Sequence, residues 1–99
     1  MKDYMEISAK AAYDVALSVN EAIVNELKSS IMKEIADARL NGDYSIQIKC
    51  EGVPYEKLNK EHIWDEISGW LLGLGFELYT TEDYKTTILQ ISWANVEQD

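Results

Sequence analysis

The stretch 86–93, which reads TTILQISW, is a run of β-branched and apolar residues in which apolar side chains recur at every second position. Leu89, Ile91 and Trp93 alternate with Ile88, Gln90 and Ser92, so one face of an extended segment would be fully apolar and the other mixed. β-Branched and aromatic side chains pack well across neighbouring strands. The pattern therefore predicts a buried strand, which we expect to be the central strand of a small sheet.

Two further segments predict its neighbours. Residues 44–50 alternate apolar and polar side chains from Tyr44 to Cys50, which indicates a strand with one polar face. A further strand begins at Phe76, and the polar segment 81–85 is the expected turn between it and the central strand.

The long segment before the first strand has a helical period. Apolar residues recur every three or four positions between 12 and 38, Ser8 is a good N-cap, and neither Pro nor Gly occurs between Ser8 and Asn41. Two arrangements fit this pattern: one helix of about 50 Å, or two helices that meet at Ser18-Val19-Asn20-Glu21, which has the form of a capping box. The pair is favoured, because one helix would overhang a domain with an expected radius of gyration of about 13 Å. An overhanging helix would need a second subunit to cover it.

A second helical segment follows the loop 51–57, which contains the only proline, Pro54. Asn59 is the expected N-cap, and Leu58 before it is expected to pack against Ile63 as a hydrophobic staple. The expected core face of this helix consists of Ile63, Ile67, Trp70, Leu71 and Leu74.

The order of these segments predicts one α+β domain that spans residues 1–99. We expect two layers, in which an N-terminal helix or helix pair is followed by a β-α-β-β unit. The simplest three-stranded sheet has the last strand in the centre, as a split β-α-β. The face of the sheet away from the helices is expected to show Ser45, Gln47, Lys49, Glu77, Tyr79, Ile88 and Gln90.

Charge narrows the classes of partner. Nine basic and eighteen acidic residues give a net charge of −9, of which residues 51–99 contribute −7. Direct binding to nucleic acid or to an anionic membrane is not expected, since both need a cationic surface. No apolar run approaches the ~20 residues of a membrane span, and the N-terminus lacks the apolar segment of a secretory signal. We therefore expect an intracellular protein, with a charge that is compatible with a basic partner.

The sequence contains few parts for catalysis. Cys50 is the only cysteine and His62 the only histidine, so an intramolecular disulfide, a cysteine metal cluster and a two-histidine metal site all lack components. Cys50 is expected to point into the core. The acidic residues around His62 suit the solvated first turn of a helix. We expect no enzyme activity, no cofactor and no metal.

Apolar positions beyond the needs of the core predict a binding surface instead. Trp64 lies on the flank of the second helical segment and Leu72 nearly opposite its core face, while Tyr79 and Ile88 point outward from the sheet. Exposed apolar patches commonly mark interfaces. The alternative is that the N-terminal helix covers Trp64 and that the other positions are scattered. The acidic residues among the candidate partner-binding positions are Glu56, Glu61 and Asp65.

Several short signatures occur together in this chain: Ile7-Ser8-Ala9-Lys10, Ile35-Ala36-Asp37-Ala38, Asn41-Gly42-Asp43-Tyr44-Ser45-Ile46, Leu74-Gly75-Phe76 and Ile91-Ser92-Trp93. Their order and spacing resemble those of small, mostly uncharacterised proteins of tailed bacteriophages. The resemblance spans most of the chain, leaves out the loop 51–59 and the acidic C-terminal part, and transfers no functional residue. It implies a phage protein that acts in the host cytoplasm or in the phage particle.

These features favour a non-enzymatic, homo-oligomeric binding protein that acts on a host protein or a small ligand during host takeover or counter-defence. Two alternatives remain open. One is an acidic inhibitor that occupies the basic nucleic-acid groove of a host protein. The other is a structural component of the phage particle.

Overall fold

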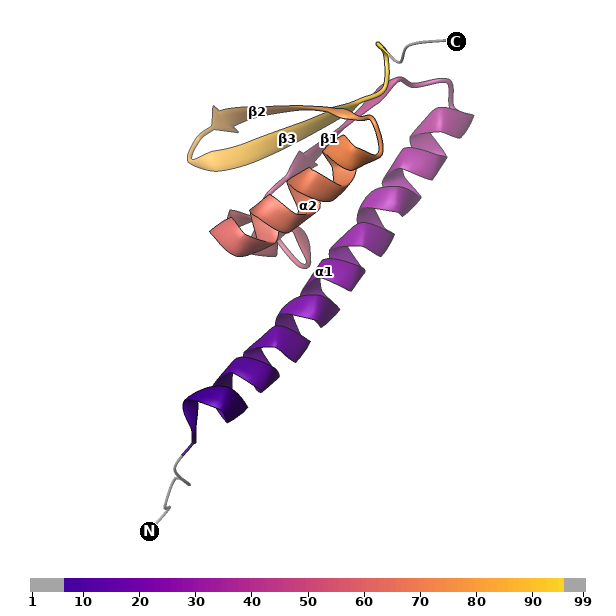
Figure 1. The fold of residues 1–99 in the computed structure, drawn as a ribbon. Coiled ribbons are helices and arrows are strands. Elements are labelled where there is room, and N and C mark those ends of the chain that lie inside the picture. The colour runs from indigo at the N-terminus through magenta and orange to yellow at the C-terminus, as the bar shows by residue number, and fades with distance from the viewer. Residues whose placement is uncertain (1–6, 96–99) are drawn as a thin grey trace.

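The computed structural model describes residues 7–95 and shows a three-stranded sheet with two α-helices on one side of it (Figure 1). In chain order the elements are α1 (Ala9–Leu40), β1 (Ser45–Lys49), the short 3₁₀ helix η1 (Tyr55–Asn59), α2 (Glu61–Gly73), β2 (Glu77–Asp83) and β3 (Thr86–Ser92). The strand order is β1-β3-β2, and both outer strands run antiparallel to β3. β1 and β2 are therefore parallel with β3 between them, which confirms the predicted α+β class and the split β-α-β sheet.

The core lies between the sheet and the two helices. From the sheet it takes Ile48, Leu89 and Ile91, which are almost fully buried. The helices contribute Ile63, Ile67 and Leu71 from α2 and Val24, Leu27, Ile31 and Ile35 from α1. Burying one side chain of this size typically contributes about 1.5–3 kcal/mol relative to leaving it exposed. This contiguous cluster is therefore the main source of stability.

The strand register explains why the two faces of the sheet differ. In β3, Leu89 lies opposite Ile48, and Ile91 lies opposite Ile46, so apolar side chains stack toward the helices. The intervening positions point to the other side, which neither α1 nor α2 covers (Figure 1). The residues on that outer face are the predicted ones: Ser45, Gln47, Lys49, Glu77, Tyr79, Ile88 and Gln90.

α1 is a single uninterrupted helix of 32 residues, so the favoured pair of helices with a joint at Ser18–Glu21 is wrong. At its start the Ser8 hydroxyl oxygen accepts a hydrogen bond from the Ala11 backbone N–H at 3.1 Å, as predicted for an N-cap. Just past its end Gly42 has a φ of +83°, the left-handed conformation that closes many helices. The capping-box residues do not break the helix, because capping groups act only where a free end exists. The alanines around them also favour an unbroken helix.

The first half of α1 extends beyond the rest of the molecule (Figure 1). The buried residues of this helix begin only at Val24. The molecule is consequently elongated, with extents of 61 × 35 × 20 Å and a radius of gyration of 17.0 Å. A compact chain of this length has a radius of gyration of about 13 Å. The single helix thus produces the overhang that a helix pair would have avoided.

The start of α2 also differs from the prediction. The helix begins at Glu61, the N-cap position is Lys60, and no side chain forms a capping hydrogen bond there. Asn59, the predicted N-cap, ends η1 instead and donates a hydrogen bond from Nδ2 to the backbone carbonyl of Cys50 at 2.9 Å. Leu58 is the buried residue of η1. This turn carries the Asn59 amide to the end of β1.

Two side chains expected on apolar faces are exposed, and a third is half-buried. Leu74 follows the last turn of α2 and Tyr44 precedes β1. Both lie just outside the element whose periodicity placed them inward. Trp70 of α2 is half-buried, and the Lys28 ammonium lies 5.3 Å from the centroid of its ring, within the range of a cation–π contact.

The hairpin between β2 and β3 is tighter than predicted. β2 continues to Asp83, so the turn is formed by Tyr84 and Lys85 alone. Their φ angles are +50° and +71°, and positive φ at both central residues gives a two-residue loop the twist of its flanking strands. After β3, the half-buried Trp93 meets Phe76 edge to face, with ring centroids 6.1 Å apart and an interplanar angle of 81°.

Candidate binding surfaces

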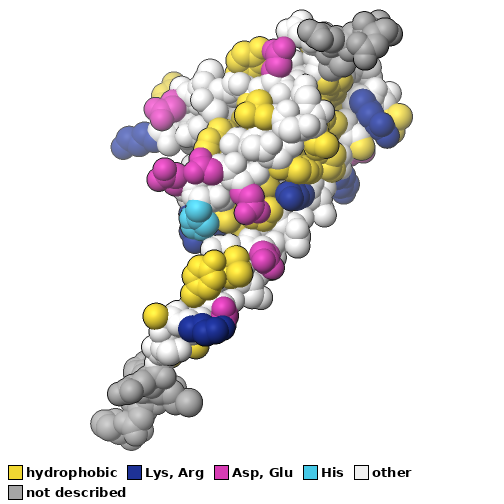
Figure 2. Space-filling view, viewed as in Figure 1, with side chains coloured by type: hydrophobic (Ala, Val, Ile, Leu, Met, Phe, Trp, Pro, Cys, Tyr) yellow, Lys and Arg dark blue, Asp and Glu magenta, His cyan; other side chains and the backbone are white. Residues whose placement is uncertain are grey.

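The free half of α1, residues 9–23, is an exposed and mostly apolar segment. Ten of its fifteen residues are apolar, and the larger side chains are 43–65% exposed; they are Tyr13, Val15, Leu17 and Val19. Figure 2 shows hydrophobic side chains gathered on this protruding part. In an ordinary surface helix such side chains form a stripe that faces the core. Here the sequence has the composition of a buried helix, but within residues 7–95 only its inner end, at Ile23, packs against the core.

Four of the five polar side chains of the free half lie in one narrow stripe, and the fifth, Asn20, lies outside it against His62. Lys10, Asp14, Ser18 and Glu21 follow one another at spacings of four, four and three, so they fall within an arc of about 80° at 3.6 residues per turn. Within this stripe the Lys10 ammonium is 2.9 Å from the Asp14 carboxylate. This exposed pair is worth little for stability, but it marks the side of the helix that faces water.

Opposite the polar stripe lies a row of small and β-branched side chains. These residues, which we name the seam, are Ala9, Ala12, Ala16, Val19 and Ile23. They alternate in spacing between three and four, which is the repeat that aligns side chains along the contact between two helices of a coiled coil. Alanine at the first three positions allows a second helix to approach closely.

The free half ends where α1 meets α2. Asn20 Oδ1 lies 3.3 Å from His62 Nε2, and the buried residues of α1 begin at Val24. His62 thus contacts α1. Among residues 7–95, no group of three His, Cys, Asp or Glu side chains has the geometry to hold a metal ion.

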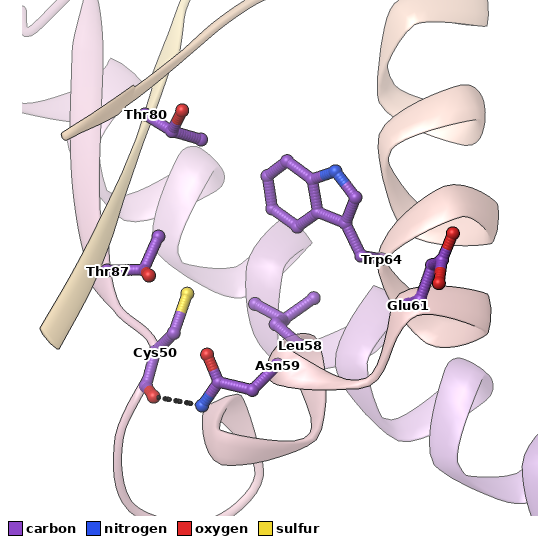
Figure 3. A pocket seen from close by; sticks show the side chains of 7 residues that line it. All are labelled: Cys50, Leu58, Asn59, Glu61, Trp64, Thr80 and Thr87. Atoms are coloured by element: carbon purple, nitrogen blue, oxygen red, sulfur yellow. Dashed lines mark hydrogen bonds between the residues drawn. The ribbon is translucent and has the colours of Figure 1, made fainter. Parts of the chain in front are cut away.

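A groove of about 330 Å³ lies between α2 and the strands (Figure 3). It is lined by Cys50, Leu58, Asn59, Glu61, Trp64, Thr80 and Thr87. In Figure 3 the Trp64 ring points from α2 toward Thr80, while Glu61 points away from the other side chains. Burial raises the pKa of the Cys50 thiol, which keeps it in the protonated, poorly nucleophilic form. His62 is not among the lining residues, so the groove has no histidine base beside the thiol.

The predicted apolar partner-binding residues do not form one surface. Tyr79 and Ile88 share the outer face of the sheet, where Ile88 lies opposite the residue two positions after Tyr79. Leu72 is exposed on α2, in the other layer. Trp64 is half-buried and lines the groove. Only Tyr79 and Ile88 are therefore neighbours.

The predicted acidic partner-binding residues lie at one end of the α2 layer. Glu56 is in η1, and Glu61 and Asp65 are in the first turns of α2. Lys57 and Lys60 stand among them in the chain. Figure 2 shows Asp and Glu side chains in separate places over the visible face, including the protruding part of α1. A nucleic-acid mimic needs a continuous acidic track, which is not seen on this face.

Sequence reasoning identified the overhanging helix as one alternative but did not select its first half as a binding surface. The signal was present in the density of apolar residues, ten in fifteen, and in the confinement of four of the five polar residues to one stripe. A helical period by itself does not say whether an apolar stripe meets the same chain or another one. The distinction requires knowing where the sheet ends along α1.

No helix in residues 7–95 is both long and apolar enough to cross a membrane. Comparison of the chain with protein-family models, with curated proteins and with solved structures gave no match.

Proposed function

We propose that this chain is a small, non-enzymatic binding protein that assembles with a second copy of itself through the free half of α1. The observation that carries the proposal is the exposed apolar surface around Tyr13, Val15, Leu17 and Val19, which the other residues of the described range 7–95 leave uncovered. Contiguous exposed apolar surface on a soluble protein commonly marks an interface. The phage origin, the action on a host factor or ligand, and the location in the host cytoplasm form the wider part of this proposal, and they rest on the resemblance of the short sequence signatures.

Charge supports a second copy as the occupant. The free half carries a net charge of only −1, whereas residues 51–99 carry −7. Two identical acidic molecules repel each other least where each is nearly neutral. Residues 9–23 are therefore the part of this chain on which self-association meets the least electrostatic opposition.

The acidic-inhibitor alternative has less support. The acidic residues that motivated it lie beside lysines, and other carboxylates lie on α1 and on the outer face of the sheet. An inhibitor of that kind would bind through a concentrated acidic surface, and its affinity would fall steeply with salt.

The proposal is tested with two neighbouring substitutions in the free half. Val19→Glu places a carboxylate in the seam, while Ser18→Glu places the same group in the polar stripe; both give a net charge of −10 from the present −9. Val19 is already 52% exposed, so both variants are expected to keep the helix content and melting behaviour of a folded monomer.

Light scattering at a series of protein concentrations gives the readout. The unsubstituted chain and Ser18→Glu are expected to have the mass of a dimer or larger assembly. Val19→Glu is expected to dissociate at concentrations higher by roughly a hundredfold, because burying an unpaired charge costs several kcal/mol and each 1.4 kcal/mol is tenfold. A monomeric unsubstituted chain at high micromolar concentration would refute the proposal. Equal masses for the two variants would show that assembly uses another surface.

A further inference from the structure

The seam has a gradient of side-chain size that decides how two helices fit together. Its outer end carries Ala9, Ala12 and Ala16, and its inner end carries Val19, which is 52% exposed, and Ile23, which is half-buried against the core of its own chain. Two packed helices keep a nearly constant separation of about 8–10 Å that depends on the side chains between them. The volumes that meet in each layer of the contact must therefore be similar along its length.

A parallel pair of helices would not have similar side-chain volumes along the contact. In a parallel arrangement each seam residue faces its own counterpart, so Ala16 meets Ala16 and Ile23 meets Ile23. The contact would be thin at the outer end and thick at the inner end. Straight helices would then leave a void beside the alanines or overlap at the isoleucines.

An antiparallel pair gives every central layer of the contact a similar side-chain volume. With the two-fold axis between Leu17 and Ser18, Ala12 of one copy lies opposite Ile23 of the second copy, and Ala16 lies opposite Val19. Each layer then combines one alanine with one β-branched residue, so the helices can lie at a uniform distance. From this complementarity we infer that two copies pair antiparallel along the seam; the inference rests on the proposed self-association.

The charge distribution leads to the same arrangement. A parallel pair would bring both copies of residues 51–99, at −7 each, to the same end of the helix pair. An antiparallel pair directs them toward opposite ends of the helix pair, so the mean distance between the two acidic parts is larger than in a parallel pair.

Cysteine cross-linking distinguishes the two arrangements. Ala16→Cys, Val19→Cys and, as a control in the polar stripe, Ser18→Cys are prepared as single variants. Cys50 is retained in all of them because it is buried. Light scattering under reducing conditions first establishes that each variant assembles as the unsubstituted chain does. The variants are then oxidised with copper phenanthroline, alone and as mixtures, and the disulfide-linked dimers are measured on non-reducing gels.

The antiparallel arrangement predicts a cross-link between different positions. The mixture of Ala16→Cys with Val19→Cys is expected to give roughly tenfold more linked dimer than either variant alone or than any mixture with Ser18→Cys, because a disulfide needs Cα atoms within about 7 Å. Strong self-linking of Ala16→Cys and of Val19→Cys would show a parallel pair and overturn the inference. An assembled protein that cross-links in no combination would exclude the seam as the contact. A protein that is monomeric before oxidation would overturn the proposed self-association itself.

Discussion

Two glycines in and after α2 offer a direct test of the backbone described here. Gly69 lies within α2, and a Cβ placed on it would meet nothing within 4 Å. Gly75 follows the helix with a φ of +96°, and a Cβ placed on it would also meet nothing within 4 Å. Replacing each by alanine therefore changes no packing in either case. Any difference in stability must come from the backbone conformation that each residue adopts.

The expected free energies of unfolding move in opposite directions. In a helix interior alanine is favoured over glycine by about 0.8–1.0 kcal/mol, so Gly69→Ala is expected to stabilise the fold by about 1 kcal/mol. A left-handed backbone costs an L-residue roughly 1–2 kcal/mol, of which about 0.4–1 kcal/mol is offset because alanine restricts the unfolded chain. Gly75→Ala is therefore expected to destabilise the fold by about 1 kcal/mol.

Urea and thermal unfolding at one fixed protein concentration measure both effects. A change of 1 kcal/mol shifts the melting temperature of a domain this size by about 4–8 °C, so the two variants are expected to differ by roughly 10 °C. Shifts of the same sign would refute the reasoning. A destabilised Gly69→Ala would mean that another molecule covers that side of α2, and a stabilised Gly75→Ala would mean that the helix does not end in a left-handed residue.

Three further changes test contacts away from α1's free half. Asn59→Ala removes the 2.9 Å hydrogen bond to the carbonyl of Cys50 and is expected to lower the free energy of unfolding by about 1–2 kcal/mol in urea titrations. Burial, the hydrogen bond to Glu34 and the charge of Glu34 raise the pKa of Tyr55. The stabilisation linked to this shift is complete below the unfolded-state pKa of about 10 and is lost as pH rises above it, so Tyr55→Phe should show a flatter decline of the urea midpoint at alkaline pH. Trp93→Ala is expected to cost about 2–3 kcal/mol by thermal unfolding, less than a fully buried tryptophan, because the ring is only half-buried.

The sheet was predictable because its signal is local. A period of two puts one set of side chains on each face, and any register that buries Leu89 and Ile91 against the helices places Ile88 and Gln90 on the outer face. The hairpin and the crossover then leave few ways to order three strands. The boundaries were less predictable, because Tyr84 and Lys85 have no intrinsic preference for positive φ and adopt it only through the pairing of the strands around them.

The errors lie where tertiary contacts decide the local structure. Asn59 has the chemistry of an N-cap, but the burial of Leu58 moves it to the end of β1. The capping box at Ser18 competes with an unbroken run of good helix formers and does not interrupt it. The surface of α1's free half could be described from sequence only as an amphipathic pattern, since its exposure depends on where the sheet and α2 stop along the helix.

The continuity of α1 also has a consequence for helix formation itself. An isolated helix of fifteen residues is marginal in water, because its first turn must be formed before any residue can be added favourably. In this protein the buried half, from Val24 to Ala38, already supplies that first turn, so the free half only has to propagate from it. Propagation adds one hydrogen bond per residue and does not involve the core. The free half is thus a segment that evolution or design can lengthen or shorten by whole turns, about 5.4 Å each, while the sheet and its core remain unchanged.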